Sequence, residues 1–218
     1  MFSIADHLKN WLTTSKVIIT QPRHFFRDMP TSGGYREPLG FAAVTVLIIS
    51  VFYAPILLVL MSLPMDIEFV IIGLVALFLY SFFSMMISIP VNGILHHILF
   101  RVYGGKGSLE ATIRVFCYYM AISLVVLPVV FVIVLFFYLA EKAGLEGAGY
   151  SLLSIVLLLG ILVLVSYSFY VLFAGFSKVH QISMKRVVLA TFSIPTVLFM
   201  ILAILAVTLV FISDYYAT

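Results

Sequence analysis

The sequence predicts an all-α integral membrane protein with five membrane-spanning helices. Of its 218 residues, 64% are hydrophobic and 10% are charged, whereas a soluble domain carries about 25% charged residues. Five stretches without Asp, Glu, Lys or Arg each exceed the ~20 residues that cross the hydrocarbon core of a bilayer. These stretches are continuous and do not alternate, which favours helices over β-barrel strands. We place the spans at about residues 39–62, 69–98, 114–140, 151–176 and 187–212.

The distribution of Lys and Arg predicts the orientation of these spans. Eleven of the twelve basic residues fall in the N-terminal segment, the second loop and the fourth loop, and Lys142 falls on the other side. Basic residues mark the cytoplasmic side of a membrane protein. We therefore expect a multi-pass protein of the cell membrane with a cytoplasmic N-terminus and an external C-terminus. Four acidic residues accompany the eleven basic ones, so the cytoplasmic face has a formal charge of +7.

Residues 1–38 are predicted to form a cytoplasmic segment that lies on the membrane surface. Apolar residues recur at roughly helical spacing around Trp11, which we place at headgroup depth. Pro22 is expected to end this helix. An apolar pair, Phe25 and Phe26, then stands among cations. Both a membrane-surface anchor and a docking epitope for a partner protein fit this pattern.

The membrane domain, residues 39–213, contains features that fit either helix packing or transport. Prolines, which weaken a helix, stand in four spans at Pro55, Pro90, Pro128 and Pro195. A polar stripe follows one face of the second span: Ser81, Ser84, Ser88 and Asn92. Small polar residues favour close helix packing, but they also suit a polar path. No charged residue stands near the middle of a span, which argues against ion-coupled transport.

The loop between the second and third spans contains three glycines, Gly104, Gly105 and Gly107, which are expected to allow a tight reversal. It is not a Walker phosphate loop, because Lys106 is followed by glycine and a membrane helix precedes it. Ser108 is predicted to cap the next helix. A phosphate headgroup held by Lys106 at this helix start is one further option.

The third span is predicted to begin outside the bilayer. A helix from Ser108 to Ala140 has about 32 residues and a length of ~48 Å, which exceeds the hydrocarbon thickness. Its first turns should therefore lie on the cytoplasmic surface. Tyr118 and Tyr119 would then mark the interface, where aromatic residues gather.

The histidines near the cytoplasmic ends of the helices raise the question of a metal site. His96 and His97 are adjacent and face different sides of a helix, so a joint site is not expected, although one of them could meet His180. Structural histidines are the main expectation, and a metal or pH-sensing site is the alternative. Cys117 is the single cysteine, and no hydrolase, protease or phosphate-loop motif is present. We expect no catalytic residue, cofactor or metal.

Several motifs, taken in order, resemble the Yip1 domain family of small membrane proteins. They are QPRHFFRDMP, REPLGFA, GGKGSLEATIRVFCYYMAISLVVLP and FAGFSKVHQISMKRVVLA, and together they cover about residues 20–212. The resemblance implies five spans and a cytoplasmic N-terminus. Eukaryotic members are associated with Rab GTPases and vesicle traffic. This chain resembles prokaryotic members, because its cytoplasmic segment is short and has no counterpart of the eukaryotic N-terminal motif, so that role is not carried over.

These observations favour a non-enzymatic membrane protein that organises the membrane or binds lipid or protein. The expected partners are membrane lipids with anionic headgroups, and either protein partners or a second copy of the chain, but not nucleic acid. A transporter, channel or lipid scramblase is one alternative, and an enzyme at the cytoplasmic interface is another. The candidate binding residues are Arg101, Lys106, Ser108, Arg114, Tyr118, Tyr119, His96 and His180.

Overall fold

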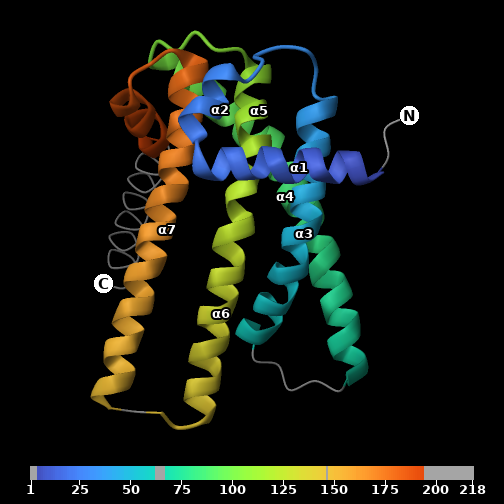
Figure 1. Ribbon diagram of the computed structural model, residues 1–218, viewed down its shortest axis with the longest axis vertical. Coiled ribbons are helices and arrows are strands. Elements are labelled where there is room, and N and C mark those ends of the chain that lie inside the picture. The colour runs from blue at the N-terminus through green and yellow to red at the C-terminus, as the bar shows by residue number, and fades with distance from the viewer. Residues whose placement is uncertain (1–3, 62–66, 146, 194–218) are drawn as a thin grey trace, which may run out of the picture.

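The computed structural model describes residues 4–61, 67–145 and 147–193, and the regular structure in these residues is entirely helical (Figure 1). Residues 184–193, at the end of this part, are also helical. The other elements are α1 (Ile4–Thr20), α2 (Pro22–Asp28), α3 (Arg36–Met61), α4 (Ile67–Val102), α5 (Leu109–Tyr119), the 3-10 turn η1 (Met120–Ile122), α6 (Ser123–Lys142) and α7 (Ala148–His180).

Four helices in the described residues are long and apolar enough to cross a membrane. They are Arg36–Ile56, Phe69–Val102, Leu109–Lys142 and Gly149–His180. The prediction of a multi-pass, all-helical membrane protein is confirmed, and these helices correspond to the first four predicted spans. Most of the fifth predicted span, from residue 194 onward and including Pro195, falls outside the described residues.

The membrane helices run up and down, while α1 lies across them (Figure 1). The chain descends in α3, returns in α4, descends again through α5, η1 and α6, and returns in α7. α1 packs against η1, and α2 packs against α7. We call the end of the bundle that carries residues 21–37, 101–122 and 178–186 the basic end. We call the lower parts of α6 and α7, residues 129–165, the far half.

The core of the described chain surrounds α5 at the basic end. All residues from 111 to 118 are buried. Two glycines allow the neighbouring helices to approach α5 closely: a Cβ on Gly93 of α4 would lie 2.6 Å from Ile113, and one on Gly175 of α7 would lie 2.7 Å from Val115. α5 is therefore held between α4 and α7 by the close approach of its Ile113 and Val115 side chains to the glycines, which larger residues would prevent.

The helix boundaries largely follow the sequence signals. α1 ends at Thr20, and Pro22 begins α2, a position where its missing N–H costs nothing. Ser108 caps α5 as predicted, because its Oγ accepts a hydrogen bond from the backbone N–H of Ala111 at 3.1 Å. The predicted continuous helix after Ser108 instead passes through the 3-10 turn η1, between α5 and α6.

Candidate functional site

The basic end exposes nearly all of the cationic side chains of the protein. Lys142 lies at the opposite end, in the last turn of α6. Arg114 lies at the basic end but is buried. The exposed cations of the basic end and of α1 are Lys9, Lys16, Arg23, Arg27, Arg36, Arg101, Lys106, Lys178, Lys185 and Arg186. This segregation of charge matches the asymmetry of the sequence.

Arg114 acts as a clamp on the loop before α3. Its guanidinium donates to the carbonyl oxygens of Pro30 at 3.2 Å and Gly34 at 2.6 Å, and to Glu110 Oε1 at 3.2 Å. The same Glu110 oxygen accepts the backbone N–H of Gly34 at 2.7 Å. Sequence reasoning places Arg114 among the lipid-facing cations. The structure instead buries Arg114 and commits it to residues 30–34, because the N–H groups of a buried guanidinium need acceptors and the carbonyl oxygens of Pro30 and Gly34 supply them.

The glycine loop closes over His180 at the end of α7. The backbone N–H of Lys106 donates to the carbonyl oxygen of His180 at 3.0 Å. A Cβ on Gly105 would lie 2.9 Å from His180 Nδ1, and a Cβ on Gly107 would lie equally close to it. The prediction that all three glycines serve a reversal is correct only for Gly104, which has a φ of +83°. The other two are glycines because the imidazole and nearby carbonyl groups leave no room for a side chain.

His180 is fully buried beneath this loop and shares a hydroxyl with His97. Thr112 Oγ1 lies 2.9 Å from His180 Nε2 and 3.4 Å from His97 Nδ1, and it donates to the carbonyl oxygen of Ser108 at 2.9 Å. The centroids of the two imidazole rings are 5.9 Å apart. The sequence allows one of the adjacent histidines to meet His180, and in the structure the histidine beside His180 is His97.

His96 points to a different set of neighbours. Its Nδ1 lies 2.9 Å from the carbonyl oxygen of Asn92, one turn earlier in α4. Its ring stacks on Phe176, with centroids 5.7 Å apart, and contacts Phe100 and Phe116. No group of three or more His, Cys, Asp or Glu side chains that could hold a metal occurs in the described residues. The geometry supports a structural role for His96 in an aromatic cluster.

The remaining predicted residues divide into exposed and packed ones. Arg101 and Lys106 are exposed beside the glycine loop, and Arg186 joins them, since its guanidinium lies 3.9 Å from the Cβ position of Gly104. Tyr119 is half-buried at the end of α5. The sequence shows that Arg186 stands in a basic loop. Nothing in the sequence indicates that this loop lies close to the glycine loop.

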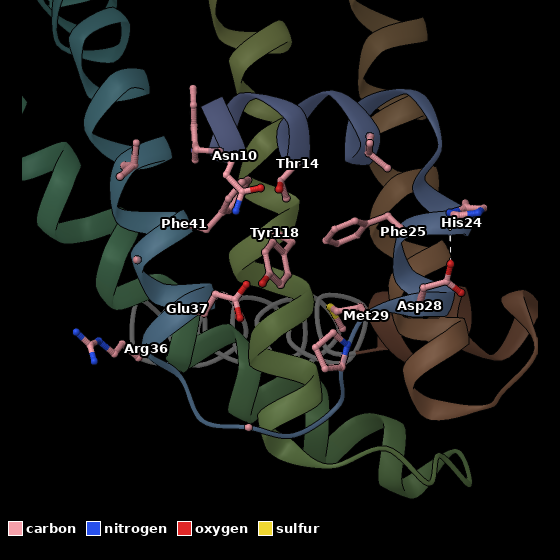
Figure 2. A pocket seen from close by; sticks show the side chains of 16 residues that line it. Asn10, Thr14, His24, Phe25, Asp28, Met29, Arg36, Glu37, Phe41 and Tyr118 are labelled. Atoms are coloured by element: carbon pink, nitrogen blue, oxygen red, sulfur yellow. Dashed lines mark ion pairs between the residues drawn. The ribbon is translucent and has the colours of Figure 1, made fainter. Parts of the chain in front are cut away.

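A cavity of about 910 Å³ lies between α1, α2 and the start of α3, with Tyr118 of α5 in its wall (Figure 2). This volume is in the range of small-molecule sites. Four aromatic rings follow one another along it. Ring centroids are 6.4 Å apart for Trp11 and Phe41, 5.1 Å for Phe41 and Tyr118, and 5.0 Å for Tyr118 and Phe25. Polar groups, including Glu37, accompany the rings.

Sequence reasoning identifies only part of this cavity. Trp11 and Tyr118 are predicted as interfacial aromatics, and Phe25 as an apolar residue among cations, but nothing in the sequence places them beside Phe41. The indole N–H of Trp11 donates to Thr45 Oγ1 of α3 at 2.9 Å, which fixes α1 against the first membrane-spanning helix. These contacts join segments that are up to about a hundred residues apart, a separation at which helical periodicity carries no information.

The polar stripe of α4 is largely satisfied within its own helix. Ser81 Oγ donates to the carbonyl oxygen of Phe78 at 2.9 Å, and Ser88 Oγ donates to that of Met85 at 2.7 Å. Asn92 Nδ2 donates to the carbonyl oxygen of Ser88 at 2.8 Å. Hydroxyls that bond to their own backbone present little free polarity to a transported solute.

A family model described as Yip1 domain matches residues 16–207, which is most of the chain. No curated protein matches it. No solved structure matches it either.

Proposed function

Because the chain belongs to the Yip1 domain family, we propose that it is a non-enzymatic, multi-pass membrane protein whose basic end binds anionic lipid headgroups and so organises the adjacent leaflet. In this proposal the chain crosses the cell membrane five times, with its N-terminus in the cytoplasm and its C-terminus outside. The four candidate membrane-spanning helices and the family assignment support a multi-pass membrane protein.

The observation that carries the proposal is the concentration of exposed cations at one end of apolar helices. Ten Lys and Arg side chains are exposed at the basic end and on α1, and Lys142 is the single basic residue of the opposite end. The leaflet facing the cytoplasm carries anionic lipids, which attract such groups by about 1 kcal/mol for each Lys or Arg near the surface. The same asymmetry supports the proposed orientation.

The position of α1 supports an interfacial depth for the aromatic residues. α1 lies across the bundle (Figure 1) and packs against η1. The turn η1 directly follows Tyr118 and Tyr119 in the chain. An amphipathic helix that lies perpendicular to the membrane helices is typical of the boundary between headgroups and acyl chains. With α1 at that depth, the loops that carry Arg101, Lys106 and Arg186 stand among or above the headgroups.

The test is to neutralise four exposed cations together in the variant R101Q/K106Q/K185Q/R186Q. Arg114 is left intact because it holds the fold. The quantity to measure is the binding of phosphatidylglycerol by the purified protein, titrated at low salt. At about 1 kcal/mol for each cation, the loss should reach about two to three orders of magnitude in the apparent Kd.

A matched variant, K9Q/K16Q/R23Q/R27Q, removes four exposed cations from α1 and α2 and reports how much the N-terminal segment contributes. Lys142→Gln, at the other end of the molecule, should leave the apparent Kd unchanged. Unchanged phosphatidylglycerol binding in both fourfold variants would refute the proposal.

A transport or scramblase function remains the competing hypothesis from the sequence. The internal hydrogen bonds of Ser81, Ser88 and Asn92 support the binding role over it. Reconstituted liposomes that scramble labelled lipid or release a solute faster than protein-free liposomes would favour transport instead.

A further inference from the structure

The cavity beside α1 contains an acidic side chain without a cationic partner among the described residues. The structure describes three acidic side chains at the basic end. The hydrogen bond from Arg27, at 2.9 Å, lowers the pKa of Asp28 and pairs its charge. Glu110 is paired with Arg114 at 3.2 Å. Glu37 lines the cavity, and no ion pair joins it to any residue in the described part of the chain.

The surroundings of Glu37 keep its charge directed at the cavity. It stands in the first turn of α3, where the positive end of the helix favours a carboxylate. Figure 2 shows Glu37 turned toward Tyr118, while the neighbouring Arg36 points away from the centre of the cavity. The cavity, which Asp28 and Arg36 also line, therefore holds one carboxylate without an ion-pair partner among the described residues.

The aromatic rings that line the cavity also favour a cation. The rings of Trp11, Phe25, Phe41 and Tyr118 form one continuous series along the cavity. Aromatic faces attract ammonium groups, and several rings together form the usual cage for them. The hydroxyl of Tyr118 lies beside Glu37 (Figure 2) and forms no hydrogen bond with any described residue. Its oxygen is free to accept one.

We propose that this cavity binds the primary ammonium of an ethanolamine-type phospholipid headgroup. Glu37 is the counter-ion, the Tyr118 hydroxyl accepts one N–H, and the ring of Trp11 covers the cation. A primary ammonium has three N–H donors, so it uses both the carboxylate and the hydroxyl. A choline headgroup has no N–H and uses only the rings. An anionic headgroup without an amine meets Glu37 as a like charge.

The position of the cavity favours a lipid over a soluble amine. Its lining continues along the first membrane-spanning helix through Phe41 and Val44. A volume of about 910 Å³ is much larger than an ammonium group and leaves apolar surface for the glycerol and the first methylenes of the acyl chains. A free amine would leave this apolar lining uncovered.

The experiment uses Trp11, the single tryptophan of the chain, as a reporter inside the cavity. The full-length protein in detergent is titrated with dihexanoyl phosphatidylethanolamine, and the emission of Trp11 is followed. We expect a saturable change for this lipid and an apparent Kd about tenfold higher for dihexanoyl phosphatidylcholine, which has the same phosphate and chains but no N–H.

Two variants test the assigned roles. Glu37→Gln keeps the shape of the side chain and removes its charge, and it should weaken phosphatidylethanolamine binding about tenfold. Tyr118→Phe keeps the ring and removes the hydroxyl, and it should weaken binding about threefold. Glu141→Gln is the matched control, because it makes the same change at an exposed position at the other end of α6, and it should bind like the parent protein.

Three results would overturn the inference. They are equal binding of the ethanolamine and choline lipids, unchanged binding in the Glu37→Gln variant, and binding of free ethanolamine as tight as that of the lipid. This experiment uses net-neutral lipids, so it is independent of the proposed binding of anionic headgroups. Either proposal can fail while the other holds.

Discussion

The two ends of this helix bundle are stabilised in different ways. At the basic end, the eight residues from 111 to 118 are all buried. Arg114 ties α5 to the loop at residues 30–34, and the hydroxyl of Thr112 ties it to His180 at the end of α7. In the far half, most side chains of α7 are exposed and apolar, such as Leu158 and Leu162. Side-chain hydrogen bonds of α7 in that region run from the hydroxyls of Ser151 and Ser154 to carbonyl oxygens four residues earlier, at Gly147 and Tyr150.

The difference follows from the solvent that each region meets. Acyl chains are as apolar as leucine, so an exposed apolar helix face in the bilayer needs no protein partner. At the basic end, buried polar side chains such as Arg114 and Thr112 need specific hydrogen-bond partners. We therefore expect the stability of the described fold to depend on few residues at the basic end and on none in particular in the far half.

The largest effect is expected from Arg114→Ala. It removes three hydrogen bonds, two of them to backbone carbonyls of residues 30–34, and leaves Glu110 without its cationic partner. Because Glu110 retains 25% of its side-chain exposure, part of its charge is solvated, and we expect a loss of about 3 kcal/mol in the free energy of unfolding. Denaturant unfolding in micelles gives this value, and limited proteolysis should show faster cleavage near residue 33.

Arg101→Ala is the control for that comparison. It makes the same chemical change at the basic end, but the side chain is exposed, and the expected change is within about 0.5 kcal/mol. Equal destabilisation by the two substitutions would show that Arg114 is not a clamp.

The contrast between Arg114 and Arg101 also shows which features can be predicted from the sequence and which cannot. Composition and the spacing of charges predict the membrane helices, and local chemistry predicts the cap at Ser108. Both arginines look alike in the sequence, since each stands near a helix end in a basic region. What separates them is the loop at residues 30–34, which comes about 80 residues before Arg114 and whose carbonyls happen to meet it.

The glycine loop likewise contains residues whose role depends on a distant segment. Glycine in a loop suggests backbone freedom, which holds for Gly104. The need for glycine at positions 105 and 107 comes from the ring of His180, which arrives from α7. The cavity is harder still to predict, because its walls come from α1, α2, α3 and α5. Contacts between distant segments depend on packing, which the local pattern of one sequence does not contain.

A smaller effect is expected from Gly107→Ala. The added Cβ would lie 2.8 Å from the carbonyl oxygen of Val179 and 2.9 Å from His180 Nδ1, and backbone atoms do not yield easily. We expect a loss of about 2 kcal/mol in the free energy of unfolding. The control is Gly149→Ala in α7, where the new Cβ would meet no neighbouring part of the structure within 4 Å, and it should cause no loss, because alanine favours a helix over glycine. The same loss in both variants would remove the special role of the glycine loop.

The smallest effect is expected from removing one methylene group, by an isoleucine-to-valine substitution, in the far half and near α5. Ile155 of α7 is 54% exposed and Ile122 of η1 is 3% exposed. Ile122→Val should lower the free energy of unfolding by about 1 kcal/mol, because neighbouring atoms cannot fill the space fully. Ile155→Val should change it by less than about 0.5 kcal/mol, because lipid or detergent chains adjust to the smaller surface. Unfolding of both variants in the same micelles checks the difference, and a loss at Ile155 equal to that at Ile122 would show that the far half is packed as specifically as the basic end.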